Sequence, residues 1–191
     1  ENGELFVLDP ATLAIVATFA VAARFLALDP AGRLLAGQRD IQRIDWSTGK
    51  VEASIEVNDP ETTKRFVPLP DGRLAHVFTG GGLRLLTLGE GGAEGTTEVV
   101  HGTRHVKSLL AVSPDGRFAV TTMADQPQTY LAVTRPELVV WDLSSRERVT
   151  EIDLGSASDR PNVATFTPDG ATLIVATERG VIASFAWSPP G

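Results

Sequence analysis

The chain has 191 residues, of which 42% are hydrophobic and 21% are charged, a balance that excludes both a disordered chain and a membrane-spanning one. The formal net charge of −7, without any basic block, argues against nucleic acid or an anionic membrane as the main partner. The absence of cysteine excludes disulfides, thiolate zinc sites and cysteine nucleophiles. It leaves the localisation open, because cytoplasmic and periplasmic or secreted proteins can both lack cysteine.

Two apolar runs at the start of the chain predict a pair of strands. The first covers 4–9, and the second covers 13–19 after a turn at Pro10. The alanine-rich segment 10–23 is the best candidate for a helix, but its β-branched residues favour a strand. The pair matches the third and fourth strands of the repeating unit that follows.

A turn flanked by apolar runs then recurs four times. Each copy has a proline that fixes φ at the first central position and a glycine two residues later that takes the left-handed conformation. The residues that precede the four prolines are 40, 44 and 54 positions apart: Asp29, Leu69, Ser113 and Thr167. Strand patterning with periods near 40 to 50 residues is typical of propeller blades.

Four strands per unit predict an all-β fold, a β-propeller of four-stranded antiparallel blades. We expect a half blade over 1–21, full blades over 22–58, 59–101 and 102–155, and an incomplete blade over 156–191. About four blades are too few for the usual closed ring, so part of a larger propeller is the favoured interpretation. The alternative is a closed four-bladed ring, in which the N-terminal strands complete the last blade.

The third full unit carries the clearest family signature. Its Ser113-Pro-Asp-Gly-Arg turn and its later Leu138-Val-Val-Trp-Asp142 run resemble a WD40 repeat. Gly102-Thr103 stands where that family has Gly-His, and glycine-rich or Glu-Arg-Gly turns replace the expected aspartate turn. These departures make the chain similar to bacterial YVTN-type and quinoprotein-type propellers.

A long excursion over 124–136 accounts for the widest spacing between copies. An insertion at this place is similar to the propeller subunit, the β-chain, of quinoprotein amine dehydrogenases. That resemblance implies a seven-bladed propeller that docks a subunit carrying a quinone cofactor and itself supplies little of the chemistry.

Polar side chains at the starts of the innermost strands form one candidate site. Counting back from the turns gives Arg24, Lys64, Ser108 and Asn162, about one per blade. They would ring the channel mouth and could bind an anion, a water cluster or an acidic group of a partner. The alternative is ordinary solvation, because channel mouths are wet and polar in any propeller.

Two loops supply the other candidate residues. Arg104 and His105 lie in a short loop. His101 and His105 are four residues apart, a spacing that can hold zinc on a helix but does not fix the ligand geometry in a loop. The 124–136 excursion carries Asp125, Tyr130 and Arg135, and tyrosine and arginine are common interface anchors. A solvated loop is the alternative, because long loops cost little entropy.

These observations favour a non-catalytic module for protein or ligand recognition or scaffolding through loops on one face. The loops bear Arg104, Tyr130, Arg135 and Arg160, and we expect no catalytic residue, metal or cofactor. The expected partner is a protein or the remainder of the chain's own propeller, with self-association as a further outcome. The alternative function is a propeller subunit or domain of a quinoprotein-type oxidoreductase.

Overall fold

The computed structural model describes residues 3–21, 23, 25–37, 40–57, 65–78, 82–91, 93–102, 106–123, 137–154 and 160–188. Strands are the only regular secondary structure that these residues form, which confirms the all-β prediction. Among them there is no helix of the length and apolar character needed to cross a membrane.

The strands make five antiparallel sheets that succeed one another along the chain. The first pairs β1 (Glu4–Leu8) with β2 (Ile15–Ala20). The second contains β3 (Phe25–Leu28), β4 (Leu34–Gly37), β5 (Asp40–Ile44) and β6 (Val51–Glu56), with β10 (Gly89–Glu90) at its edge. The third contains β7 (Arg65–Pro68), β8 (Leu74–Val77), β9 (Leu83–Thr87) and β11 (Thr96–His101).

The last two sheets complete the molecule. One contains β12 (Val106–Val112), β13 (Phe118–Met123), β14 (Glu137–Asp142) and β15 (Glu147–Ile152) in that order. The other contains β16 (Pro161–Phe166), β17 (Thr172–Thr177) and β18 (Ile182–Ala186). The strands of each sheet are antiparallel neighbours, as in propeller blades.

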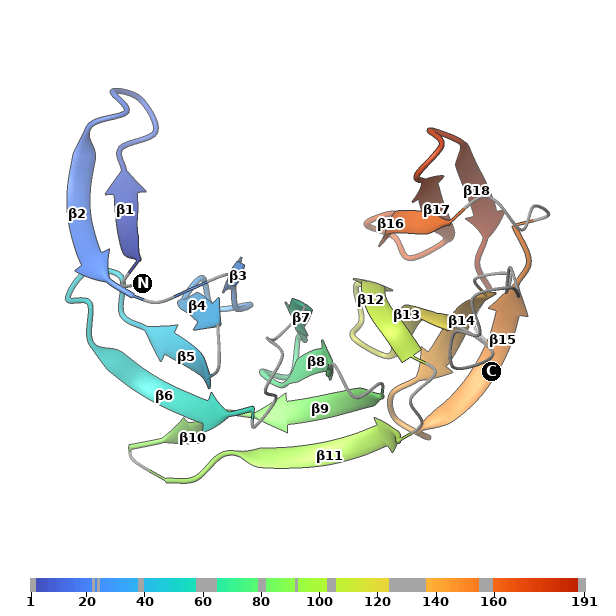
Figure 1. Cartoon of the computed structure of the whole chain (residues 1–191), viewed down its shortest axis with the longest axis horizontal. Helices are drawn as coiled ribbons and strands as arrows, with labels where there is room; N and C mark the ends of the chain where they lie inside the picture. Colours follow the sequence, from blue (N-terminus) through green and yellow to red (C-terminus); the bar gives the residue numbers. More distant parts are fainter. Residues whose placement is uncertain are drawn as a thin grey trace, which may run out of the picture.

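The five sheets follow an open arc (Figure 1). Strands β3, β7, β12 and β16 lie on its inner side, and β2, β6, β11 and β15 lie on its outer side (Figure 1). The β1–β2 pair forms a sheet of its own and does not join the β16–β17–β18 sheet. The closed four-bladed ring, the less favoured expectation, is therefore wrong for this structure.

The four repeated turns are closed in the same way, as their sequence predicts. In each, the glycine N–H donates to the carbonyl of the residue before the proline over 2.8–3.0 Å. The glycine φ angles lie between 72° and 86°, a region in which a side chain would be strained. The glycines are Gly32, Gly72, Gly116 and Gly170.

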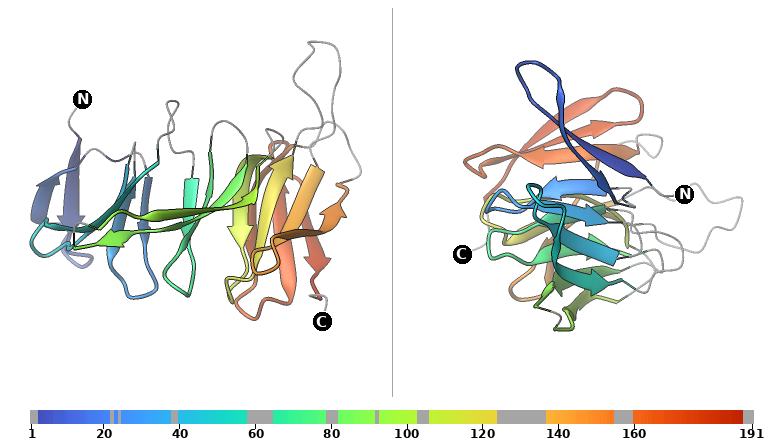
Figure 2. Two further views of the ribbon diagram at one scale, coloured as in Figure 1. Left: turned by 90° about the horizontal axis from the view of Figure 1, so that it is seen from below. Right: turned by 90° about the vertical axis from the view of Figure 1, so that its left-hand side faces the viewer.

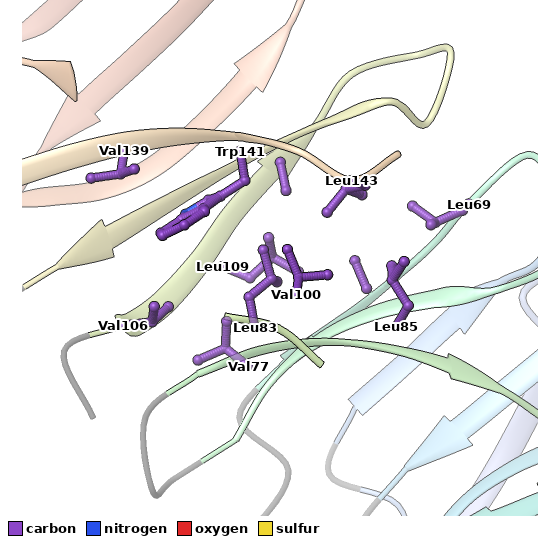
Figure 3. Close-up of a cluster of buried hydrophobic side chains, with 12 residues drawn as sticks. Leu69, Val77, Leu83, Leu85, Val100, Val106, Leu109, Val139, Trp141 and Leu143 are labelled. Carbon is purple, nitrogen blue, oxygen red and sulfur yellow. The ribbon is translucent and has the colours of Figure 1, made fainter. Parts of the chain in front are cut away.

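Successive sheets from β3 onward pack face to face and share apolar clusters. The cluster between the third and fourth sheets is drawn in Figure 3, with Trp141 and Leu143 on one side and Leu83 and Leu85 on the other. Similar clusters lie between the second and third sheets and between the fourth and fifth. Burial between sheets is what stabilises a propeller, since one blade covers its apolar faces only with its neighbours.

The glycine-rich segment 89–95 does more than form a hairpin loop, because it also joins two sheets. Its β10 strand pairs with β6, placing Gly89 opposite Ser54 and Glu90 opposite Ala53. Arg43 Nη2 donates to Glu90 Oε1 at 2.8 Å. The β9–β11 hairpin therefore lies against the preceding sheet and is held there by backbone pairing and an ion pair.

The sheets at the ends of the arc expose apolar side chains. Leu138 and Ile182 occupy equivalent positions on the third strands of the last two sheets. Leu138 lies opposite Thr122 of β13, and Ile182 lies opposite Ala176 of β17. Leu138 is 0% exposed because the last sheet covers it, whereas Ile182 is 74% exposed. Phe6 and Leu8 of β1 are also exposed at the other end.

Candidate functional site

A cleft opens where two of the repeated turns lie side by side. One turn links β12 to β13 and the other links β16 to β17, and both lie on the face that carries the β3–β4 and β7–β8 hairpins (Figure 2, left). The cleft has a volume of about 570 Å³, within the range of small-ligand pockets. It is lined by Ser113, Pro114, Asp115, Phe118, Pro168, Asp169, Gly170, Ala171 and Trp187.

The two turns are built alike. Ser113 Oγ donates to Asp115 Oδ1 at 2.5 Å and accepts from the Phe118 N–H at 2.9 Å. Thr167 Oγ1 in the same way donates to Asp169 Oδ1 at 2.5 Å and accepts from the Thr172 N–H at 3.1 Å. Each aspartate side chain is thus fixed within its own turn by its Oδ1 atom.

The turns at this junction are packed less tightly than those at the junction before it. A Cβ on Gly116 would lie 2.5 Å from Pro70 Cδ, so the β7–β8 and β12–β13 turns touch. A Cβ on Gly170 would lie 3.7 Å from Pro114 Cδ, which is ordinary contact distance. The last two turns therefore stand further apart than the two before them.

Trp187 forms the aromatic wall of the cleft. Its ring meets Phe118 edge-on at 5.2 Å between centroids and Phe166 at 6.1 Å. Its backbone N–H donates to the Ala171 carbonyl at 2.8 Å, which ties the end of β18 to the turn. Because Phe118 is only 1% exposed, the indole presents the larger aromatic surface of the cleft.

The carboxylates of the cleft differ from those of the other repeated turns in their pairing. Asp29 pairs with Arg33 at 2.6 Å, and Asp71 pairs with Arg73 at 2.7 Å. In the described part of the chain no arginine or lysine pairs with Asp115 or Asp169. The cleft is therefore flanked by two carboxylates that their own turns do not neutralise.

Asp142 explains why Asp115 lacks its arginine. Arg117, which follows the turn glycine, donates from Nε to Asp142 Oδ2 at 2.8 Å instead. Burial favours a raised pKa for Asp142, but the N–H groups of Ser145 and Ser144 and the Arg117 guanidinium outweigh it and lower the pKa. In the last turn the arginine position is occupied by Ala171.

A second polar arrangement lies within the blades and is buried. Trp141 Nε1 donates to Thr121 Oγ1 at 2.8 Å, and the His101 ring lies 4.4 Å from the Trp141 ring. His76 of β8 is 0% exposed. Trp141, Thr121 and His76 are enclosed by the packed sheets, so they serve the fold rather than a surface site.

Seven of the ten sequence-predicted binding residues lie outside the described residues: Arg24, Lys64, Arg104, His105, Asp125, Tyr130 and Arg135. Ser108 and Asn162 are exposed on the neighbouring inner strands β12 and β16. Arg160 is exposed, and its carbonyl accepts from the Glu178 N–H at 2.9 Å. A role for these residues in binding stays a prediction.

Sequence reasoning does not single out the cleft residues. The local pattern marks Asp115 and Asp169 as turn-forming and Trp187 as part of a strand. The usable signal is the missing arginine at position 171 in an otherwise repeated turn. Among the residues that the structure describes, no group of three or more histidine, aspartate or glutamate side chains is arranged to hold a metal ion.

Comparison with known proteins identifies the fold. No family model and no curated protein matches the sequence. The crystal structure of the Cps50 (Swd1) β-propeller domain from Myceliophteria thermophila is similar, with a TM-score of 0.73 and 13% sequence identity. The match covers 99% of this chain and 62% of that one, so the chain spans less than two thirds of that propeller. The likeness shows a β-propeller fold.

Proposed function

We propose that this chain is a non-catalytic recognition module of the WD40-like propeller type. The observation that carries the proposal is the cleft between the turns at 113–118 and 167–171, with its indole wall and its two carboxylates. A concave site with an aromatic surface and a few fixed polar groups suits the docking of a partner segment.

The rigidity of the cleft supports this function. Its walls are two tight turns, each closed by a glycine N–H and braced by an aspartate. Binding to a preformed surface loses less entropy than binding to a loop that must first become ordered. The propeller would thus act as a scaffold that holds the two turns at a fixed separation.

The WD40-like character rests on particular residues. Trp141 and Asp142 end β14, the indole donates to Thr121, and Asp142 pairs with Arg117 from the turn of the same sheet. The alternative of a quinoprotein-type oxidoreductase subunit depends on the 124–136 excursion, which lies outside the described residues. We therefore propose the recognition module alone.

Peptide selection tests the proposal and requires no identified partner. Random linear peptides displayed on phage are selected against the whole chain, and the affinities of the selected peptides are measured by calorimetry. We expect Trp187→Ala to weaken them about tenfold or more, the loss of one interface anchor. Trp46→Ala is the matched control, because Trp46 is 52% exposed and lies outside the cleft lining.

A folding control separates loss of the site from loss of structure. Trp187→Leu keeps an apolar group against Phe118 and Phe166 but removes the indole surface. We expect this variant to unfold near the wild-type temperature and still to bind poorly. Peptides that bind Trp187→Ala and the wild type equally would contradict the proposed function.

A further inference from the structure

We propose that the cleft accepts a cationic side chain, the guanidinium of an arginine or the ammonium of a lysine, from the partner segment. This inference rests on the proposed function and names the chemistry that the site selects. It follows from charge, from the atoms left available and from the aromatic wall.

The repeat itself supplies the charge argument. In the β7–β8 turn, Asp71-Gly-Arg73, the arginine pairs with the carboxylate of its own turn. At Asp115 the arginine is diverted to Asp142, and at Asp169 an alanine takes its place. A cationic group of a partner would give the cleft carboxylates the ion pair that Asp29 and Asp71 make with the arginines of their own turns.

Each of the two carboxylates keeps one oxygen atom that takes part in none of the described hydrogen bonds. The hydrogen bonds described for Asp115 and Asp169 all end on Oδ1, from the turn hydroxyls and from the Arg117 and Ala171 N–H groups. The Thr167 hydroxyl is the main cause of the lowered pKa of Asp169, which keeps that group ionised at neutral pH. An ionised carboxylate with its Oδ2 atom available is a strong acceptor for a charged donor.

The aromatic wall favours the same ligand. An indole is the best ring for a cation placed over its face, and a planar guanidinium also stacks on it. The fold already uses this contact next to the cleft, where the Arg117 guanidinium lies 4.8 Å from the centre of the Phe118 ring. The net charge of −7 adds a general attraction for a basic segment.

The test uses N-ethylguanidinium as the arginine probe, n-butylammonium as the lysine probe and neutral N-ethylurea as the control for shape. The indole N–H resonances of the three tryptophans are followed by NMR on the whole chain. We expect the Trp187 resonance to shift in a saturable way with the two cations and not with the urea. The resonance of buried Trp141 should stay in place, and raising the salt from about 0.05 M to about 0.5 M should weaken binding.

Ala171→Arg is the decisive variant. It gives the last turn the arginine that follows Gly72 in the β7–β8 turn, so Asp169 should become paired internally, and we expect cation binding to weaken about threefold to fivefold. The double variant Asp115→Asn with Asp169→Asn should lose the response, whereas Asp71→Asn, the matched change in a turn that carries its own arginine, should keep it. Equal shifts with N-ethylurea, or unaltered binding by Ala171→Arg, would overturn the inference.

The outcomes separate this inference from the proposed function. Selected peptides that need Trp187 but contain no lysine or arginine would overturn the cationic ligand and leave the recognition module in place. A saturable response to N-ethylguanidinium without any Trp187-dependent peptide would overturn the recognition module and leave a cation site.

Discussion

Asp142 joins groups from two different turns. Its Oδ1 accepts the N–H groups of Ser144 and Ser145, and its Oδ2 accepts the Arg117 guanidinium. Only 7% of its side chain is exposed, whereas its partners lie nearer the surface, so the three bonds are partly buried. The sequence identified Asp142 as the end of a WD40-like strand, but its bond to Arg117 spans 25 residues and could not be predicted locally.

Replacing this carboxylate should destabilise the protein. We expect Asp142→Ala to lower the free energy of unfolding by about 2–3 kcal/mol, since a charged acceptor is lost and two N–H groups lose their partner. Asp142→Asn should lower the free energy of unfolding by less, because its amide oxygen can still accept from the Ser144 and Ser145 N–H groups. Urea unfolding measures both, with exposed Asp40→Asn as a control that should change stability by about 0.5 kcal/mol or less.

The pH dependence of the same variant follows from the lowered pKa of Asp142. A carboxyl whose pKa is lower in the folded state stabilises fully above its unfolded pKa of about 3.9, and this contribution is lost as the pH falls through the folded value. The difference in stability between wild type and Asp142→Asn should therefore be constant near neutral pH and narrow below about pH 4. A difference that stays the same down to pH 2.5 (about one and a half units below the unfolded value) would contradict this account.

At the scale of elements, local sequence predicted strands and turns better than contacts between sheets. The prolines and glycines of the turns predicted the hairpins correctly, because a turn is determined by four consecutive residues. Strand β10 was missed because it has two residues and pairs with β6 of the preceding sheet. The pairing of β10 with β6 requires the backbone at Gly95 to lie very close to its neighbours. A Cβ on Gly95 would lie 2.6 Å from the Thr87 carbonyl oxygen and 2.9 Å from Ile55 Cβ.

A methyl group at these glycines should disturb the hairpin. A Cβ on Gly89 would overlap the carbonyl oxygen of Ala93, which belongs to the backbone and cannot rotate away. We expect Gly89→Ala to destabilise the protein by about 1–3 kcal/mol through overpacking. Gly102→Ala is the control, because its nearest contact would be Val99 Cγ1 at 3.6 Å. Equal unfolding midpoints for the two variants in chemical denaturation would show that the β9–β11 hairpin tolerates the extra atom.

At the scale of the whole molecule, the repeat predicted a propeller and an open arrangement of its sheets. It could not predict the cleft, whose walls come from turns about 54 residues apart and whose depth depends on how closely those turns stack. Nor could it predict which arginines pair within their turns, because Arg73 and Arg117 follow the same Asp-Gly sequence and pair differently. Sequence patterns thus define blades, and packing between blades defines the site.

The exposed apolar ends of the arc lead to the last prediction, which concerns self-association. The faces at β1 and β18 are the two sides that blades use to pack on one another, so one copy can place its last sheet against the first sheet of another. We expect sedimentation velocity to show association that increases with concentration, and Ile182→Lys to shift the protein toward monomer. Val99→Lys changes a 50% exposed valine of β11, away from both end sheets, and should have no effect. A wild-type chain that stays monomeric at every concentration would show that these faces do not bind each other.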